Sequence, residues 1–180
     1  IDSLFSFCNL EGKNLNGWHV LSKISAPDPS KNETGGNFSI CYIVEKNGVE
    51  YFMKVLDMRI CNSGRLPSGY TRAQYIEKCT REFNYEKNLS SYCDSKNIKS
   101  VVAYIDGGDA TLSEFPLGDV SYIIYEKADG DIRKVLNLSK KLVFTEQLKN
   151  ISMKLKSLHD ITVGIQQLHK NEISHQDMKP

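Results

Sequence analysis

The sequence predicts an α+β fold with two lobes. Five strand-like segments and one long helical segment lie within residues 18–128, whereas helical periodicity dominates the chain after Asp129-Gly130. Strands followed by helices are typical of an antiparallel sheet whose helices are segregated from it. Because an Asp-Gly dipeptide favours a turn, it marks a hinge-like boundary between the two lobes.

Five segments have the composition and alternation of β-strands. The two that flank Lys46-Asn47-Gly48 form a predicted hairpin, because Asn-Gly is a preferred two-residue β-turn. A stretch rich in Pro, Asn and Gly precedes this hairpin and predicts a loop. We therefore expect an antiparallel five-stranded sheet. Its strands are residues 18–24, 38–45, 49–56, 100–105 and 120–125.

Two long segments and a short one are predicted to be helical. Residues 71–92 contain no Gly or Pro, and residues 145–170 carry apolar side chains at steps of three and four. A short helix is expected over 131–138. The stripe of the first long helix is Tyr75, Ile76, Cys79 and Phe83, and that of the second is Ile151, Leu155, Leu158, Ile161, Ile165 and Leu168. The stripe of the second long helix is expected to be buried.

The composition excludes several classes of function. The sequence has 23 Lys and Arg against 22 Asp and Glu, so it lacks the basic excess that nucleic-acid binding needs. No apolar run approaches the ~20 residues that span a bilayer, so no membrane partner is expected. The five cysteines contain no C-x-x-C pair, which favours reduced thiols in a cytoplasmic protein over disulfides or a zinc site. The first residue is Ile rather than Met, from which we expect a piece of a longer protein.

The sharpest motif is His175-Gln176-Asp177-Met178-Lys179-Pro180. It resembles the catalytic loop of protein kinases, written H-R-D-L-x-x-x-N. The resemblance implies that Asp177 accepts the proton of the attacking hydroxyl and that Lys179 neutralises phosphoryl charge. A lysine at that position is similar to serine/threonine kinases rather than tyrosine kinases. Gln176 replaces the family's arginine, which implies an activity that activation-loop phosphorylation does not switch on.

A second motif, Tyr51-Phe52-Met53-Lys54-Val55, lies in the predicted strand after the hairpin. It resembles the V-A-I-K strand of kinases, which implies that Lys54 binds the α- and β-phosphates of ATP. The helix at 71–92 is then expected to supply an acidic partner. Glu86 fits the family's spacing best, and Glu82, one turn earlier on the same face, is the alternative. Taken alone, a strand lysine is also typical of a solvated sheet edge.

The segment from Tyr122 to Asp131 resembles the last strand of the small kinase lobe and the hinge that follows it. By that resemblance Tyr125 is the gatekeeper at the back of the nucleotide site. Glu126 and Ala128 offer backbone hydrogen bonds to adenine, and Asp131 reaches the ribose. A strand end followed by a helix cap is an equally good local interpretation.

Two features depart from the family pattern. Alignment on Phe38 places Thr34, Gly36, Ser39 and Cys41 where the family has three glycines and a valine, and Gly35 adds local freedom. The loop's backbone amides can still face phosphate, but close approach is harder. Phe52 replaces the alanine above adenine, and overfilling a packed site costs about 1–3 kcal/mol. We therefore expect Phe52 to narrow the adenine pocket if its ring points inward.

The motifs occur in the family's order over roughly residues 18–180. The resemblance implies an N-terminal extension at 1–17, a kinase N-lobe at 18–128, and a hinge exit and incomplete helical C-lobe at 129–180. It implies ATP and Mg²⁺ as cofactors and Ser/Thr hydroxyls of a protein substrate as acceptors. The asparagine and Asp-Phe-Gly that bind magnesium in the family would follow Pro180. We therefore expect no metal ligand within the chain and no phosphoryl transfer by this chain alone.

Two other functions are compatible with the same fold. The depleted glycines and Phe52 favour a pseudokinase, which would bind nucleotide or act as a scaffold, whereas Lys54, Asp177 and Lys179 favour an active enzyme. A kinase-fold phosphotransferase acting on a small molecule is the third possibility. Lys179-Pro180 weighs against it, because an Asp-x-Lys-Pro sequence is more similar to protein kinases.

Overall fold

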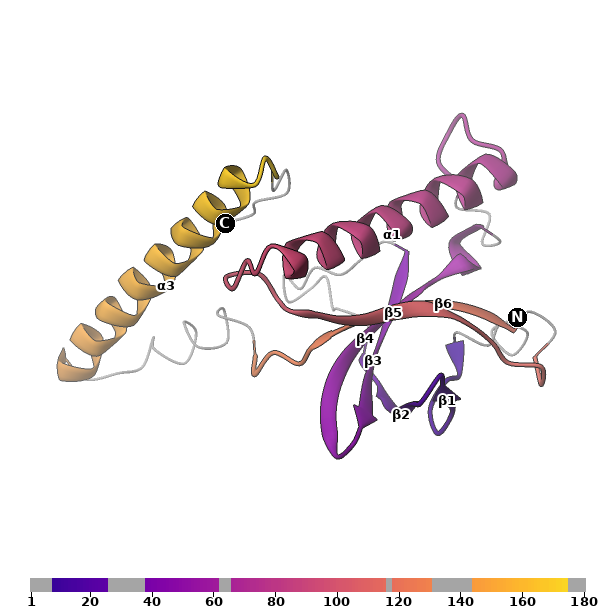
Figure 1. Cartoon of the computed structure of the whole chain (residues 1–180), viewed down its shortest axis with the longest axis horizontal. Helices are drawn as coiled ribbons and strands as arrows, with labels where there is room; N and C mark the ends of the chain where they lie inside the picture. The colour runs from indigo at the N-terminus through magenta and orange to yellow at the C-terminus, as the bar shows by residue number, and fades with distance from the viewer. Residues whose placement is uncertain (1–7, 26–37, 62–65, 116–117, 131–143, 175–180) are drawn as a thin grey trace. The chain divides into compact units, whose positions relative to one another are not determined.

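The computed structural model describes residues 8–25, 38–61, 66–115, 118–130 and 144–174 (Figure 1). The chain divides into two compact units, which are described separately below. The first unit is Ile1–Ser91 with Tyr104–Lys127, and the second is Tyr92–Ala103 with Ala128–Pro180. The helix expected at 131–138 lies outside the described residues.

A six-stranded antiparallel sheet forms most of the first unit, with the strand order β1-β2-β3-β4-β6-β5. The prediction of five strands is wrong, because the two-residue strand β1 pairs with β2. So short a segment has no periodicity from which to recognise it. The strands are β1 (Asn14–Leu15), β2 (Trp18–Lys23), β3 (Ser39–Lys46), β4 (Val49–Leu56), β5 (Tyr104–Thr111) and β6 (Asp119–Glu126).

The hairpin between β3 and β4 is confirmed. Its register runs without interruption from Ser39 opposite Leu56 to Lys46 opposite Val49. Asn47 and Gly48 form the turn with φ values of 56° and 77°. Both values lie in the left-handed region, as a two-residue turn of type I′ requires, and Asn and Gly are the residues that tolerate it best.

Strand β5 is displaced from its predicted position. Sequence analysis places a strand at 100–105 and a connection after it, whereas Tyr104–Thr111 pairs with β6 along nearly its whole length. The glycines in this segment conceal the strand. A Cβ on Gly107 would lie 3.0 Å from the Tyr104 hydroxyl oxygen and 3.1 Å from Lys87 Cδ. Gly107 therefore leaves room for a side chain of α1 to pack closely on the strand.

Helix α1 (Arg72–Ser95) confirms the first long helix, and both of its ends carry capping motifs. Thr71 Oγ1 accepts a hydrogen bond from the Gln74 amide, and Gln74 Oε1 accepts one from the Thr71 amide, which is a capping box. At the other end Asn97 has a φ of 54°, and the Ile98 amide bonds to the Cys93 carbonyl. This is a Schellman motif with asparagine in the left-handed position.

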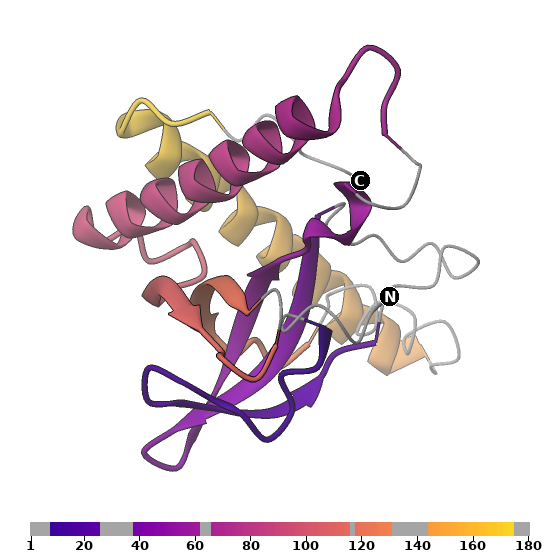
Figure 2. The same cartoon turned by 90° about the vertical axis from the view of Figure 1, so that its right-hand side faces the viewer.

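The two faces of the sheet support separate cores. One face carries Tyr42, Met53 and Ile124 and is covered by the N-terminal segment, in which Leu10 and Leu15 are fully buried. The segment that sequence analysis assigns to an extension therefore supplies core residues. The other face carries Leu56 and Ile123, which pack against Tyr75, Cys79 and Phe83 of α1. Figures 1 and 2 show α1 on one side of the sheet and the β1–β2 hairpin on the other.

Side chains from β2 and from the turn before it join the two ends of the sheet. Trp18 Nε1 donates a 2.8 Å hydrogen bond to Asp106 Oδ2, and Asn16 Nδ2 donates to the Asp109 carbonyl at 3.1 Å. Asp106 and Asp109 lie on β5, at the opposite end of the strand order from β1. The sheet therefore curls around the first core, and the hairpin partly protects the exposed edge of β5.

The second unit contains helix α3 (Phe144–Lys170), which confirms the second long helix. The prediction that its apolar stripe is buried is wrong for most of its length. Leu168 is buried, but Ile151, Leu155, Leu158 and Ile161 are 44–62% exposed, because no described residue covers them. Across the described ranges, no helix combines the length and apolar character that crossing a membrane requires.

We predict that Trp18→Phe will lower the free energy of unfolding by about 2 kcal/mol. The substitution removes the indole donor and leaves the half-buried carboxylate of Asp106 with one hydrogen bond fewer. Urea unfolding followed by circular dichroism measures the change. Tyr85→Phe is the control, because Tyr85 is 68% exposed. Equal midpoints for both variants would contradict a stabilising bond between the ends of the sheet.

Candidate functional site

The sheet face beneath α1 carries four of the described candidate residues. Side chains alternate along a strand, so Phe52 and Lys54 of β4 point to the same face. Cys41 of β3 lies opposite Lys54, and Tyr125 of β6 lies opposite Phe52. These four residues, which come from three separate segments of the sequence, are therefore neighbours on three adjacent strands.

Lys54 forms a bidentate ion pair with Glu86 of α1. Lys54 Nζ lies 2.8 Å from Oε1 and 2.6 Å from Oε2 of the carboxylate, and the side chains are 19% and 34% exposed. Partial burial reduces solvent screening, so this contact is stronger than an ordinary surface ion pair. Glu82, the alternative partner, instead lies 3.8 Å from Lys78 on the same helix. The structure therefore brings Glu86, and not Glu82, to Lys54.

Tyr125 reaches the same carboxylate from the sheet. Its hydroxyl donates a hydrogen bond of 3.1 Å to Glu86 Oε1 and lies 3.0 Å from Ser90 Oγ, one turn further along α1. Burial raises the pKa of Tyr125 well above its usual range, and the negative charge of Glu86 raises it further, although the bond to Ser90 lowers it. The hydroxyl therefore keeps its proton at neutral pH.

Phe52 lies beside Tyr125 on the candidate site. The ring centroids are 6.5 Å apart at an interplanar angle of 41°, and Phe52 is half-buried. The ring is therefore on the Lys54 face of the sheet rather than turned into the core beneath it. This is the orientation in which a large side chain would narrow a cavity above β4.

Cys41 is the remaining member of the cluster. It is half-buried, and burial raises the pKa of its thiol, although the nearby Lys54 ammonium opposes that shift. A raised pKa keeps the side chain a neutral thiol, which is a weak nucleophile and a poor metal ligand. In the described part of the chain, no three His, Cys, Asp or Glu side chains are grouped as a metal ion would need.

The other candidate residues divide into two groups. Phe38 packs against the core under α1, Ser39 begins β3, and Glu126 and Ala128 are exposed. Outside the described residues lie Thr34, Gly35, Gly36, Asp131, Gln176, Asp177 and Lys179. The structure therefore describes the lysine side of the candidate site, and the roles of the catalytic loop remain predictions.

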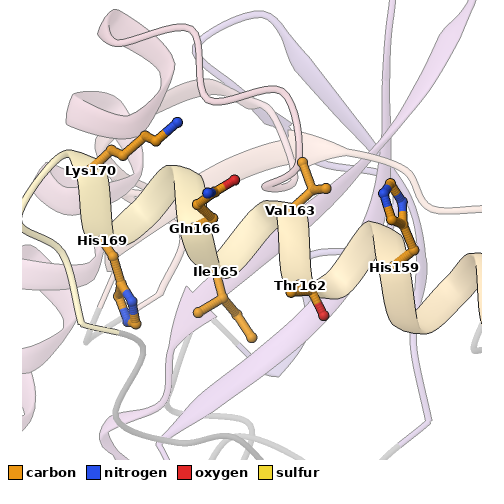
Figure 3. Close-up of a pocket in the computed structure, with 7 residues that line it drawn as sticks. All are labelled: His159, Thr162, Val163, Ile165, Gln166, His169 and Lys170. Atoms are coloured by element: carbon orange, nitrogen blue, oxygen red, sulfur yellow. The ribbon is translucent and has the colours of Figure 1, made fainter.

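A hollow of about 740 Å³ along α3 was not predicted from the sequence. Its described lining residues are His159, Thr162, Val163, Ile165, Gln166, His169 and Lys170. Figure 3 shows that these side chains leave the helix in different directions and do not converge on one point. A binding site needs convergent polar groups, so the hollow is a weaker candidate than the cluster around Lys54.

Sequence analysis missed one member of that cluster, Ser90. It occupies position i+4 from Glu86, so a helical pattern places the two on one face. However, a serine in a helix has no feature that distinguishes it from a solvated residue. Its contact with Tyr125 spans 35 positions in the sequence and becomes visible only in the fold.

Comparisons with known proteins identify the fold of the chain. No protein family model and no curated protein matches the sequence. Among solved structures, the kinase domain of PF14_0431 is similar over 94% of this chain and 40% of its own, with a TM-score of 0.58 and 18% identity. Two crystal structures of the Mycobacterium tuberculosis PknI kinase domain have TM-scores of 0.53 and 0.52 at 14% identity, again over 94% of this chain. The chain has a partial protein kinase fold.

The kinase fold is shown here for part of a domain. The chain spans 40%, 56% and 54% of the three matched chains, which is about half of their length. The described part consists of an antiparallel sheet, one helix packed on it and one further long helix. A full helical lobe is not shown, because α1 and α3 are the only α-helices within the described ranges.

We predict that Glu86→Gln will lower the free energy of unfolding by about 1 kcal/mol, because it leaves the partly buried Lys54 ammonium without an opposite charge. Glu82→Gln is the matched control, since it removes the same charge one turn earlier on α1. It should change stability by less than about 0.5 kcal/mol. Chemical denaturation of both variants tests the difference, and equal losses would show that the ion pair adds nothing specific.

Proposed function

We propose that the intact protein is a protein kinase that transfers the γ-phosphoryl group of ATP to serine or threonine hydroxyls. The observation that carries this proposal is the Lys54–Glu86 ion pair on a partial kinase fold. An ammonium fixed by a helix carboxylate above a sheet is the arrangement that positions ATP phosphates in protein kinases. The resemblance of Asp177 and its neighbours to a catalytic loop gives independent support.

The residues around Lys54 fit a nucleotide. The lysine is charged and 19% exposed, so its ammonium can meet phosphate oxygens while Glu86 holds it in place. In this proposal, backbone amides near Gly35 and Gly36 cover the phosphates, and the carbonyl and amide groups at Glu126 and Ala128 hydrogen-bond adenine. Phe52 and Tyr125 would contact the base with their rings.

The transfer step is assigned to the catalytic loop. Asp177 would accept the proton of the substrate hydroxyl as its oxygen attacks the γ-phosphorus, and Lys179 would neutralise charge on the phosphoryl oxygens. Bound magnesium would supply positive charge that offsets the charge developing on the phosphoryl oxygens. Asp131 would hold the ribose and so fix the nucleotide in line with the hydroxyl.

A pseudokinase is the second candidate, and one observation favours it. The Phe52 ring lies on the face of the sheet where the nucleotide would bind. Such a protein would bind nucleotide weakly, or not at all, and would act through its surface. A kinase-fold enzyme that phosphorylates a small molecule is a third candidate, supported only by the shared fold.

Nucleotide binding separates these candidates first. We predict that Mg-ATP will raise the melting temperature of the intact protein, and that Lys54→Met will weaken Mg-ATP binding at least about tenfold, because it removes a charge-assisted contact to phosphate. Lys154→Met, which removes an exposed lysine from α3, is the control and should leave binding unchanged.

Transfer of radiolabelled phosphate to a protein mixture and to a metabolite mixture then separates a protein kinase from a small-molecule kinase. Binding without transfer would favour the pseudokinase, and no binding would contradict an ATP site.

A second prediction concerns Phe52. If the ring occupies space that adenine needs, then Phe52→Ala will strengthen Mg-ATP binding by about 5- to 150-fold, the equivalent of relieving 1–3 kcal/mol of overpacking. Phe52→Leu should give an intermediate gain because leucine is of intermediate size. Isothermal titration calorimetry measures all three proteins. Weaker binding in both variants would show that the ring contributes contact area instead of obstructing the base.

A further inference from the structure

The carboxylate of Glu86 receives hydrogen bonds from two strands. Lys54 of β4 contacts both of its oxygens, and Tyr125 of β6 contacts Oε1 at 3.1 Å. Ser90, on the next turn of α1, contacts the same tyrosine hydroxyl at 3.0 Å. Two groups of the helix and two of the sheet therefore meet around one phenol oxygen and one carboxylate.

The direction of these hydrogen bonds follows from the number of protons available. A phenol has one proton to donate, and an ionised carboxylate can only accept. Tyr125 must therefore donate to Glu86, so the contact between Tyr125 and Ser90 requires the serine hydroxyl to donate. Ser90 therefore donates a hydrogen bond to Tyr125, and Tyr125 donates one to Glu86. Each hydroxyl orients the group to which it donates, and the last acceptor is the carboxylate that binds Lys54.

We propose that Tyr125, oriented by Ser90, is a positioning residue that sets the Lys54–Glu86 pair before the nucleotide binds. This inference rests on the proposed ATP site. Glu86 is 34% exposed, so without a second donor its side chain has access to water and to other rotamers. The hydrogen bond from Tyr125 keeps Oε1 of Glu86 facing β6 and so restricts rotation of the carboxylate. Lys54 then meets a fixed acceptor instead of a mobile one.

The affinity for nucleotide depends on how much of the protein has the Lys54–Glu86 pair formed before binding. The apparent affinity of a ligand falls in proportion to the fraction of protein in the binding-competent arrangement. If the tyrosine bond keeps most molecules in the paired arrangement, its loss lowers that fraction. A coupling of the usual size between two sites corresponds to a change of about fivefold or more in affinity.

The test is a double-mutant cycle on the intact protein. Tyr125→Phe keeps the ring but removes the hydroxyl, and it is made in the wild type and in Glu86→Gln. Ser90→Ala tests the orienting group, and Tyr85→Phe on the exposed part of α1 is the matched control. Two readouts are needed: amide hydrogen exchange of α1 without nucleotide, and the dissociation constant of Mg-ATP by calorimetry.

We expect Tyr125→Phe to speed amide exchange around Glu86 and to weaken Mg-ATP binding about fivefold. Ser90→Ala should act in the same direction but more weakly, and Tyr85→Phe should do neither. In the Glu86→Gln background Tyr125→Phe should have little further effect on either readout, because the group through which it acts is already altered. A loss that only reflected poorer packing would persist in both backgrounds.

Two results would overturn the inference. One is unchanged exchange in Tyr125→Phe, which would show that the hydroxyl does not hold Glu86. The other is an equal loss of Mg-ATP affinity with and without the Glu86 carboxylate, which would show that Tyr125 acts on the nucleotide directly. If the wild type binds no Mg-ATP but exchange responds as expected, then the proposed function fails while the positioning role holds.

Discussion

The ammonium of Lys54 and the carboxylate of Glu86 form an ion pair at the solvent-exposed edge of the core under α1. Each charge loses part of its water there, so each needs a partner of opposite sign in close contact. That requirement fixes both the rotation of α1 about its axis and its position along β4. The helix can satisfy it because Tyr75, Cys79 and Phe83 anchor its apolar side against Leu56 and Ile123.

The other face of the sheet makes this arrangement possible. Segment 8–17 and the indole of Trp18 cover the first core and join the two ends of the sheet, so the strands curl away from α1. The face beneath the helix carries the second core and, beside it, polar and aromatic side chains from β3, β4 and β6. A site that needs a fixed lysine is therefore built on strands whose reverse side is fully packed, which limits their movement.

Two large aromatic rings on that face distinguish this site. Phe52 and Tyr125 lie side by side on adjacent strands, where a smaller residue than Phe52 is usual in the kinase family. In the proposed ATP site, the Phe52 ring would reduce the space available to the base, whereas the hydroxyl of Tyr125 adds a third group to the ion pair. If the proposed function holds, the same cluster combines a ring that weakens nucleotide binding with a hydroxyl that stabilises the ion pair on which binding depends.

The sequence alone determined the parts of the fold whose signals are local. The β3–β4 hairpin follows from Asn47-Gly48, and the two long helices follow from apolar spacing within single turns. Only the tertiary structure decided which of Glu82 and Glu86 meets Lys54, since both lie on one face and the choice depends on how Phe83 packs against the sheet. Only the tertiary structure revealed β1 and β5 as strands. A two-residue strand and a strand with adjacent glycines have no clear sequence pattern and are defined by hydrogen bonds to their neighbouring strands. The contact of Ser90 with Tyr125 joins residues 35 positions apart. No local sequence pattern predicts it, because the two residues come close only when α1 packs on the folded sheet.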